Sequence, residues 1–166
     1  MTSTPGRLTR SIVLSALAGD VAITAYLVIE RAIASHVPLA QCLLELMQWD
    51  ASNAYGVRAF AGGWATAGIG QLMDLVVSLG WATLFVLCWA RFAALHRATW
   101  AWGLAYGVLV MIVMLYLVVP LGHAQRMDST PAHILNVLIA HSLFFGLPLA
   151  MTSRFLLDVR ASGAMK

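Results

Sequence analysis

Charged residues are scarce in this sequence. They make up only 10% of its 166 residues, against about 25% in an ordinary soluble domain, while 61% of the residues are hydrophobic. This balance excludes an ordinary soluble protein and indicates a lipid bilayer as the main surrounding. The net charge of +3 is small and lies mostly at the ends of apolar segments, as membrane topology requires, so it gives no case for nucleic acid as a partner.

Cysteine is also rare. The two cysteines, Cys42 and Cys88, are expected near opposite membrane faces, where they cannot pair within one chain. Neither has the spacing of a metal or redox motif. The sequence therefore excludes a disulfide scaffold and leaves the cofactor unknown.

Long apolar segments are what the sequence has in abundance. A helix of about 20 apolar residues can cross a bilayer, and four such segments are present, over residues 11–29, 62–90, 99–121 and 132–153. Pro148 is expected to kink the last one. The chain, residues 1–166, has room for a single integral membrane domain. We therefore predict an all-α fold, a four-transmembrane-helix bundle.

A shorter helix is predicted over residues 38–50, before the second span. Pro38 suits a helix start, and Trp49 suits the headgroup layer. Two interpretations stay open: a short interfacial amphipathic helix on the outer membrane surface, or a helical loop packed on the bundle. The amphipathic interpretation puts Leu39, Cys42, Leu43, Leu46 and Met47 on one face, opposite Gln41, Glu45 and Gln48.

Small residues gather in the first half of the second span, at four-residue spacing. Small residues at this spacing let two helix backbones approach closely inside a membrane. The sequence therefore predicts a face that packs against a neighbouring helix, made of Gly62, Gly63, Thr66, Ala67 and Gly70.

The basic residues predict the orientation of the helices. Cytoplasmic loops carry an excess of Lys and Arg, so the side richer in them should be the cytoplasmic one. We therefore predict a multi-pass membrane protein with both termini cytoplasmic. That side would hold Arg7, Arg10, Arg91, Arg97, Arg154, Arg160 and Lys166, and the other side Arg31, Arg58 and Arg126.

Three ionisable residues fall in the middle of predicted spans. Asp20, Asp74 and His141 each lie about 13–18 Å from a membrane face at 1.5 Å per helical residue, and Gln71 and Thr24 share faces with the two aspartates. Because an isolated charge at this depth is costly, we predict a buried polar layer. Two interpretations stay open: a site for a proton, a metal ion or a small polar ligand, or hydrogen-bonding groups that hold the helices together.

Other chemistry has weaker support. His36, His123 and His133 fall near the outer face, where they form a conceivable metal site or are simply solvated loop residues. Two intramembrane aspartates are reminiscent of aspartyl intramembrane proteases, but the Gly-x-Gly-Asp motif is absent because Gln71 follows Gly68-Ile-Gly70. We assign no catalytic residue and do not expect an enzyme.

A series of short motifs resembles a known family. In order they are Gly19-Asp20, Gln48-Trp-Asp-Ala-Ser52, Ala59-Phe-Ala-Gly-Gly63, Tyr106-Gly107, Val119-Pro-Leu121, and His141 before Gly146-Leu-Pro148. The chain resembles a family of small uncharacterised four-helix bacterial inner-membrane proteins, a domain of unknown function. The resemblance implies four transmembrane helices and a bacterial inner membrane, and it implies no activity, ligand or catalytic residue.

Two function classes follow from these observations. The first is a binding or conducting protein that uses the buried polar layer. The second is a structural or accessory subunit, whose glycine-rich and tryptophan-rich faces pack in a homo-oligomer or against a larger membrane complex.

Overall fold

The computed structural model describes residues 5–124 and 130–158, and these residues are almost entirely helical, with no strand among them. Four helical runs are long and apolar enough to cross a membrane, at residues 6–35, 63–91, 99–121 and 131–158. The prediction of an all-helical protein with four long apolar helices is confirmed. Insertion into a membrane is taken up as a proposal below.

The elements follow one another in a simple order. The first and second runs are α1 (Pro5–Ser35) and α3 (Gly63–Arg91). Between them lie α2 (Leu39–Tyr55) and the 3-10 helix η1 (Gly56–Ala61), and α4 (Ala94–Arg97) follows α3. The third run is α5 (Thr99–Val113), η2 (Met114–Val118) and α6 (Val119–Leu121), and the fourth is α7 (Pro131–Ile139), η3 (Ala140–Gly146) and α8 (Leu147–Asp158).

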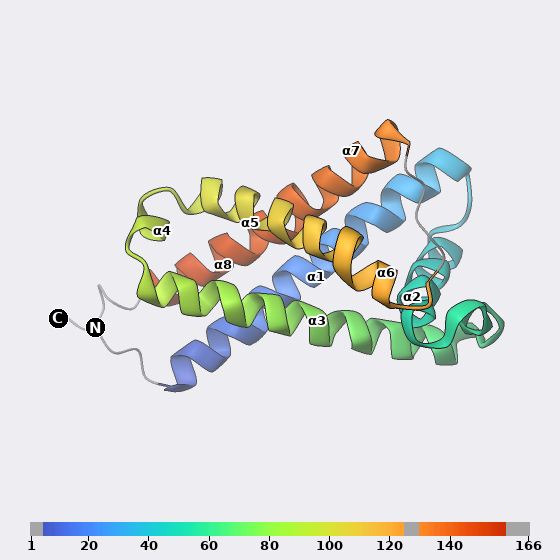
Figure 1. Ribbon diagram of the computed structural model, residues 1–166, viewed down its shortest axis with the longest axis horizontal. Coiled ribbons are helices and arrows are strands. Elements are labelled where there is room, and N and C mark those ends of the chain that lie inside the picture. The colour runs from blue at the N-terminus through green and yellow to red at the C-terminus, as the bar shows by residue number, and fades with distance from the viewer. Residues whose placement is uncertain (1–4, 125–129, 159–166) are drawn as a thin grey trace.

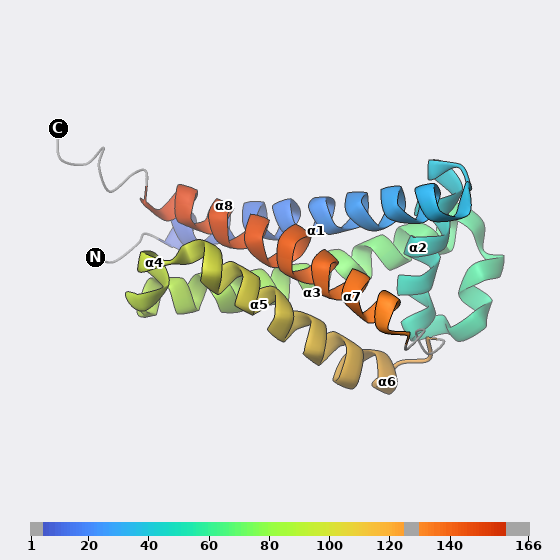
Figure 2. The same cartoon turned by 90° about the horizontal axis from the view of Figure 1, so that it is seen from above.

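The long helices lie side by side with two distinct ends (Figures 1 and 2). One end, here called the terminal end, holds the start of α1, the α3–α5 connection and the end of α8. The other, the α2 end, holds α2, η1, α6 and the start of α7. Arginines are unequally divided between them: Arg7, Arg10, Arg91, Arg97 and Arg154 lie toward the terminal end, and Arg31 and Arg58 toward the α2 end. Arg126, Arg160 and Lys166 lie outside the described residues.

Prolines widen two of the long helical runs. A proline inside a helix removes one backbone hydrogen bond and crowds the carbonyl four residues earlier. The π-helical segment η3 immediately precedes the turn that holds Pro148, and the π-helical segment η2 precedes Pro120. Both prolines are thus accommodated by a local π-helical turn, a recognised form of helix irregularity.

The third and fourth runs cross with almost no side chain between them. A β-carbon added at Gly107 would lie 2.1 Å from the backbone oxygen of His141, and one at Gly146 would lie 2.2 Å from that of Gly103. Glycine is needed at this crossing because any side chain would overlap the opposite backbone. The apolar core lies nearby, around Phe85, Trp89 and Leu149.

Candidate functional site

Helix α2 packs tightly across α3. A β-carbon added at Gly70 would lie 1.8 Å from the backbone oxygen of Met47 and 2.9 Å from the backbone nitrogen of Ala51. Ala51 and Ala67 are fully buried at this contact. The small residues therefore let the backbone of α2 contact the backbone of α3 directly. The spacing of small residues predicted close packing against a neighbouring helix, and that neighbour is α2.

One residue of the predicted amphipathic pattern of α2 lies on the other side of the helix. Gln48, expected on the polar face, is only 4% exposed. The Gln48 amide donates to the backbone oxygen of Gly63 at 3.2 Å. The side of α2 that meets α3 is therefore small and polar, and α2 is a helix packed on the bundle.

The packing prediction also needs correction at the start of α3. Gly63 has open space around its position and a φ of +56°, so its role is conformational. A β-carbon at Gly62 would meet only the side chain of Thr66, and the Thr66 hydroxyl donates to the backbone oxygen of Ala59 at 2.6 Å. Of the five predicted packing residues, Ala67 and Gly70 make the helix contact, and the other three shape the η1–α3 turn.

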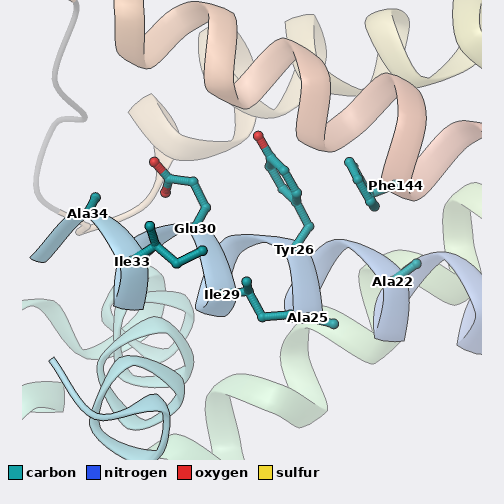
Figure 3. Close-up of a pocket in the computed structure, with 8 residues that line it drawn as sticks. All are labelled: Ala22, Ala25, Tyr26, Ile29, Glu30, Ile33, Ala34 and Phe144. Atoms are coloured by element: carbon teal, nitrogen blue, oxygen red, sulfur yellow. The ribbon is translucent and has the colours of Figure 1, made fainter. Parts of the chain in front are cut away.

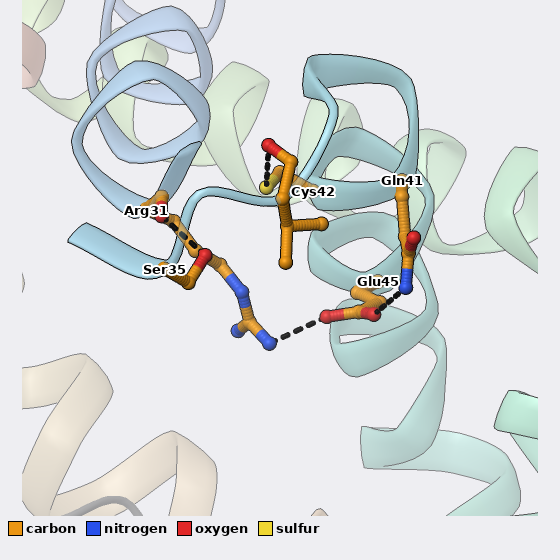
Figure 4. Close-up of polar contacts among 6 residues, drawn as sticks. Arg31, Ser35, Gln41, Cys42 and Glu45 are labelled. Atoms are coloured by element: carbon orange, nitrogen blue, oxygen red, sulfur yellow. Dashed lines mark hydrogen bonds and ion pairs between the residues drawn. The ribbon is translucent and has the colours of Figure 1, made fainter. Parts of the chain in front are cut away.

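Polar contacts hold the other end of α2 against α1 (Figure 4). The Arg31 guanidinium pairs with the Glu45 carboxylate. Gln41 donates to the other oxygen of Glu45 at 3.0 Å. Together with the α3 contact, this pair fixes the position of the remaining α2 side chains relative to α1.

This arrangement brings carboxyl groups together between α1, α2 and α3. Asp20, in the middle of α1, is only 4% exposed. Its carboxylate accepts hydrogen bonds from the Gln71 amide at 3.0 Å and from the Ser78 hydroxyl at 3.3 Å. The carboxyl group of Asp74 also makes a side-chain hydrogen bond with Asp20. Gln71, Asp74 and Ser78 occupy one face of α3, because they are three to four residues apart.

A third carboxyl group, Asp50 of α2, joins this pair. Burial raises the pKa of Asp50 well above its ordinary range, and the neighbouring carboxyl groups of Asp74 and Asp20 raise it further. We call Asp20, Asp50 and Asp74, with the donors Gln71 and Ser78, the aspartate cluster. Sequence reasoning missed Asp50 because it grouped ionisable residues by their depth within the four predicted spans, and Asp50 lies outside those spans.

Two residues of the predicted polar layer, His141 and Thr24, do not hydrogen-bond to the aspartates in the described part of the chain. A ring nitrogen of His141 lies 2.9 Å from the backbone oxygen of Val137, and the described residues show no hydrogen bond between His141 and an aspartate. Thr24 likewise makes none. The layer predicted from depth is thus an aspartate cluster between α1, α2 and α3, with His141 on the fourth run bonded within its own helix.

The outer histidines do not form a metal site in the structure. His36 and His123 are exposed, and His133 lies on α7. Within residues 5–124 and 130–158, no group of three or more His, Cys, Asp or Glu side chains is arranged to hold a metal ion.

The carboxyl groups of the aspartate cluster lie close enough to interact electrostatically. Two ionised carboxylates in contact repel each other strongly where water is scarce. A proton shared between two such groups would relieve this repulsion. Within the described residues, no basic side chain pairs with Asp20, Asp50 or Asp74.

Comparison with protein families, curated proteins and solved structures finds no match to this chain. The resemblance to a bacterial inner-membrane family stays a prediction.

The raised pKa of Asp50 predicts how stability depends on pH. The folded protein holds the Asp50 proton at pH values where the unfolded chain, with a pKa of about 4, has lost it. Stability should therefore fall as pH rises from about 4 through the raised pKa of Asp50. Asp50→Asn should remove this part of the fall and be more stable than the wild type at about pH 8. Thermal unfolding in detergent measures it.

Glu45→Gln is the matched control on the same helix. It removes the same charge but breaks the ion pair with Arg31, so it should give no stabilisation at pH 8. If Asp50→Asn and Glu45→Gln behave alike across the pH range, Asp50 is not the source of the pH dependence.

Proposed function

We propose that the chain is a multi-pass protein of the bacterial inner membrane that binds an exchangeable proton at the Asp20–Asp74 pair. Four apolar helices of sufficient length support the membrane assignment. The unequal division of the described arginines supports cytoplasmic placement of the terminal end. The α2 end would then face the periplasm.

The hydrogen bond between the Asp74 and Asp20 carboxyl groups carries this proposal. A hydrogen bond between two carboxyl groups requires a proton on one of them. Asp20 already accepts hydrogen bonds from Gln71 and Ser78, so both of its carboxyl oxygens act as acceptors. We therefore assign the proton to Asp74, which donates it to Asp20.

Exchange with water would occur from the α2 end. Asp20 is buried, whereas Asp74 and Asp50 are partly exposed. Asp50 belongs to α2, which lies toward that end. Protons would therefore pass through Asp50 to Asp74, and then to the pair with Asp20. Some membrane proteins couple proton binding to a movement of helices or of a small polar ligand. Such coupling requires at least one group that binds a proton inside the membrane.

Proton uptake by the purified protein tests this function. Asp74→Asn keeps the size of the side chain and removes its ability to bind a proton. Between about pH 8 and pH 5, the wild type should take up about one proton more than Asp74→Asn, because the variant lacks the shared site. The uptake is measured with a pH indicator in weakly buffered detergent solution.

Asp158→Asn is the control, because Asp158 is an exposed carboxyl group on α8 that pairs with Arg154. It should take up as many protons as the wild type over this interval. Equal uptake by the wild type and Asp74→Asn would contradict the proposal and favour the alternative function, an accessory subunit in which the aspartates only hold helices together.

The small-residue face of α3 is not available to a partner of such a subunit, because Ala67 and Gly70 are buried under α2.

A further inference from the structure

A second site is present on another face of α1, as an apolar groove of about 710 Å³. It runs along α1 from Ala22 to Ala34, and Phe144 of η3 forms its opposite wall (Figure 3). The groove residues Ala22, Tyr26 and Glu30 lie on a different side of the helix from Asp20. Successive residues of an α-helix are rotated by about 100° around its axis. The groove is therefore separate from the aspartate cluster.

The shape of the groove is fixed by Tyr26. Its ring stacks on Phe144 with centroids 4.2 Å apart, and its hydroxyl donates to the Asn136 side-chain oxygen of α7 at 2.6 Å. These contacts hold one wall in place where α1 and α7 diverge toward the α2 end (Figure 2). A preformed apolar groove of this kind is suited to a flexible hydrocarbon chain.

The length of the groove corresponds to one half of a bilayer. Ala22 and Ala34 are twelve residues apart, which is about 18 Å along a helix, and one leaflet of hydrocarbon is about 15 Å thick. The Ala22 end lies near the middle of α1 and the Ala34 end near its outer terminus. A partner transmembrane helix, or a second copy of this chain, would be expected to contact both leaflets instead.

Glu30 is the single charged residue that lines the groove, and it lies toward the Ala34 end. Figure 3 shows the Glu30 side chain extending from α1 on the same side as Tyr26. Within the described residues the Glu30 carboxylate makes no hydrogen bond or ion pair, whereas the adjacent Arg31 is paired with Glu45. A carboxylate left free at the headgroup level complements a cationic headgroup.

We propose that this groove binds one phospholipid with a primary amine headgroup, in the leaflet at the α2 end. The acyl chain lies along Ala22 and Ala25 against the Tyr26–Phe144 wall, and the ammonium group pairs with Glu30. The assignment rests on the membrane insertion proposed above, but it does not depend on proton binding at Asp74.

Lipid retention measured by native mass spectrometry tests the site. The protein is transferred from mild detergent into mixtures of phosphatidylethanolamine and phosphatidylglycerol with identical acyl chains. The wild type should retain one phosphatidylethanolamine in preference to phosphatidylglycerol by about fivefold, the ratio that corresponds to a partly exposed ion pair. Glu30→Gln should abolish the preference, and Ala25→Phe should reduce retention of both lipids by filling the groove.

Glu45→Gln is the matched control, because it removes a carboxylate at the same end but outside the groove, and it should keep the preference. Equal retention of the two lipids by the wild type, or equal loss in Glu30→Gln and Glu45→Gln, would overturn the lipid site. A dimer that disappears in Ala25→Phe would overturn it in favour of a second copy of the chain.

Asp74→Asn should retain lipid normally, so failure of the proton site and failure of the lipid site are distinguishable. Absence of both lipids from the wild type would likewise overturn the lipid site.

Discussion

Replacing Gly70 with alanine should detach α2 from α3. The added β-carbon would lie 1.8 Å from the Met47 backbone oxygen, and a backbone atom cannot move aside as a flexible side chain can. Overpacking a tight contact usually costs about 1–3 kcal/mol. Here the obstacle is the opposing main chain, so we expect a loss of about 3 kcal/mol or more in the free energy of unfolding. Thermal unfolding in detergent should show a decrease of about 10 °C in Tm.

Gly68→Ala is the matched control for this change. Gly68 lies two residues away on α3, and nothing is within 4 Å of a β-carbon added there. Alanine is the better helix former by about 1 kcal/mol, so this variant should be as stable as the wild type or slightly more so. If Gly70→Ala and Gly68→Ala have equal stability, α2 does not rest on the α3 backbone as the structure shows.

Because α2 carries Asp50, the same variant should also alter the aspartate cluster. Displacement of α2 would expose Asp50 to water and remove the burial that raises its pKa. The fall in stability between about pH 4 and pH 8 should therefore be smaller in Gly70→Ala than in the wild type. Comparing the two pH profiles separates a local displacement of α2 from a general loss of packing.

Replacing Asp20 with leucine should have the second largest effect. Leucine removes the acceptor of the Gln71 and Ser78 hydrogen bonds and the partner of Asp74. A buried donor left without an acceptor costs about 1–3 kcal/mol, so we expect a loss of about 2 kcal/mol or more. Asp20→Asn keeps an oxygen acceptor at this position and should stay within about 1 kcal/mol of the wild type. Chemical or thermal unfolding of the two variants measures the difference.

A double substitution checks that lost hydrogen bonds are the cause. In a background of Gln71→Leu and Ser78→Ala, the two donors to Asp20 are absent, so Asp20→Leu should cost less than it does alone. Replacing a complete buried polar group by apolar residues is often neutral or stabilising. If Asp20→Leu alone is as stable as Asp20→Asn, the hydrogen bonds to Asp20 contribute little.

The long helices could be predicted from the sequence because a single physical requirement determines them. A bilayer demands about 20 apolar residues per crossing, and segments such as 99–121 meet that requirement without reference to any tertiary contact. The structure gives the same bounds for this run, Thr99–Leu121. The helix over residues 11–29 extends further, to Pro5–Ser35, because polar residues outside the hydrocarbon can continue a helix.

The orientation of α2 could not be predicted because tertiary packing overrides its hydrophobic pattern. Periodicity alone placed Gln48 toward water, yet its amide finds acceptors in the backbone of η1 and α3. A buried polar side chain is tolerated when its hydrogen bonds are satisfied. The spacing of small residues at Ala67 and Gly70 was the more informative signal, although it did not identify α2 as the helix that packs there.

The aspartate cluster was only partly accessible from sequence. Depth along a helix placed Asp20 and Asp74 at similar levels, and the structure brings their carboxyl groups into contact. Depth also grouped His141 with them, but depth carries no information on direction around the helix, and His141 bonds within its own helix. Asp50 required knowledge of where α2 lies, which depends on the contact at Gly70.

The infrared spectrum of the carboxyl groups tests the central claim most directly. A protonated carboxylic acid has a carbonyl stretching band that a carboxylate lacks, so the spectrum reports whether a proton is bound. Near pH 7 the wild type should show this band, and Asp74→Asn should show a weaker band, because Asp74 donates the shared proton to Asp20. The band that remains would come from Asp50, whose pKa is also raised. A wild-type spectrum with every carboxyl group ionised, or a band that persists unchanged in Asp74→Asn, would contradict proton binding at the Asp20–Asp74 pair.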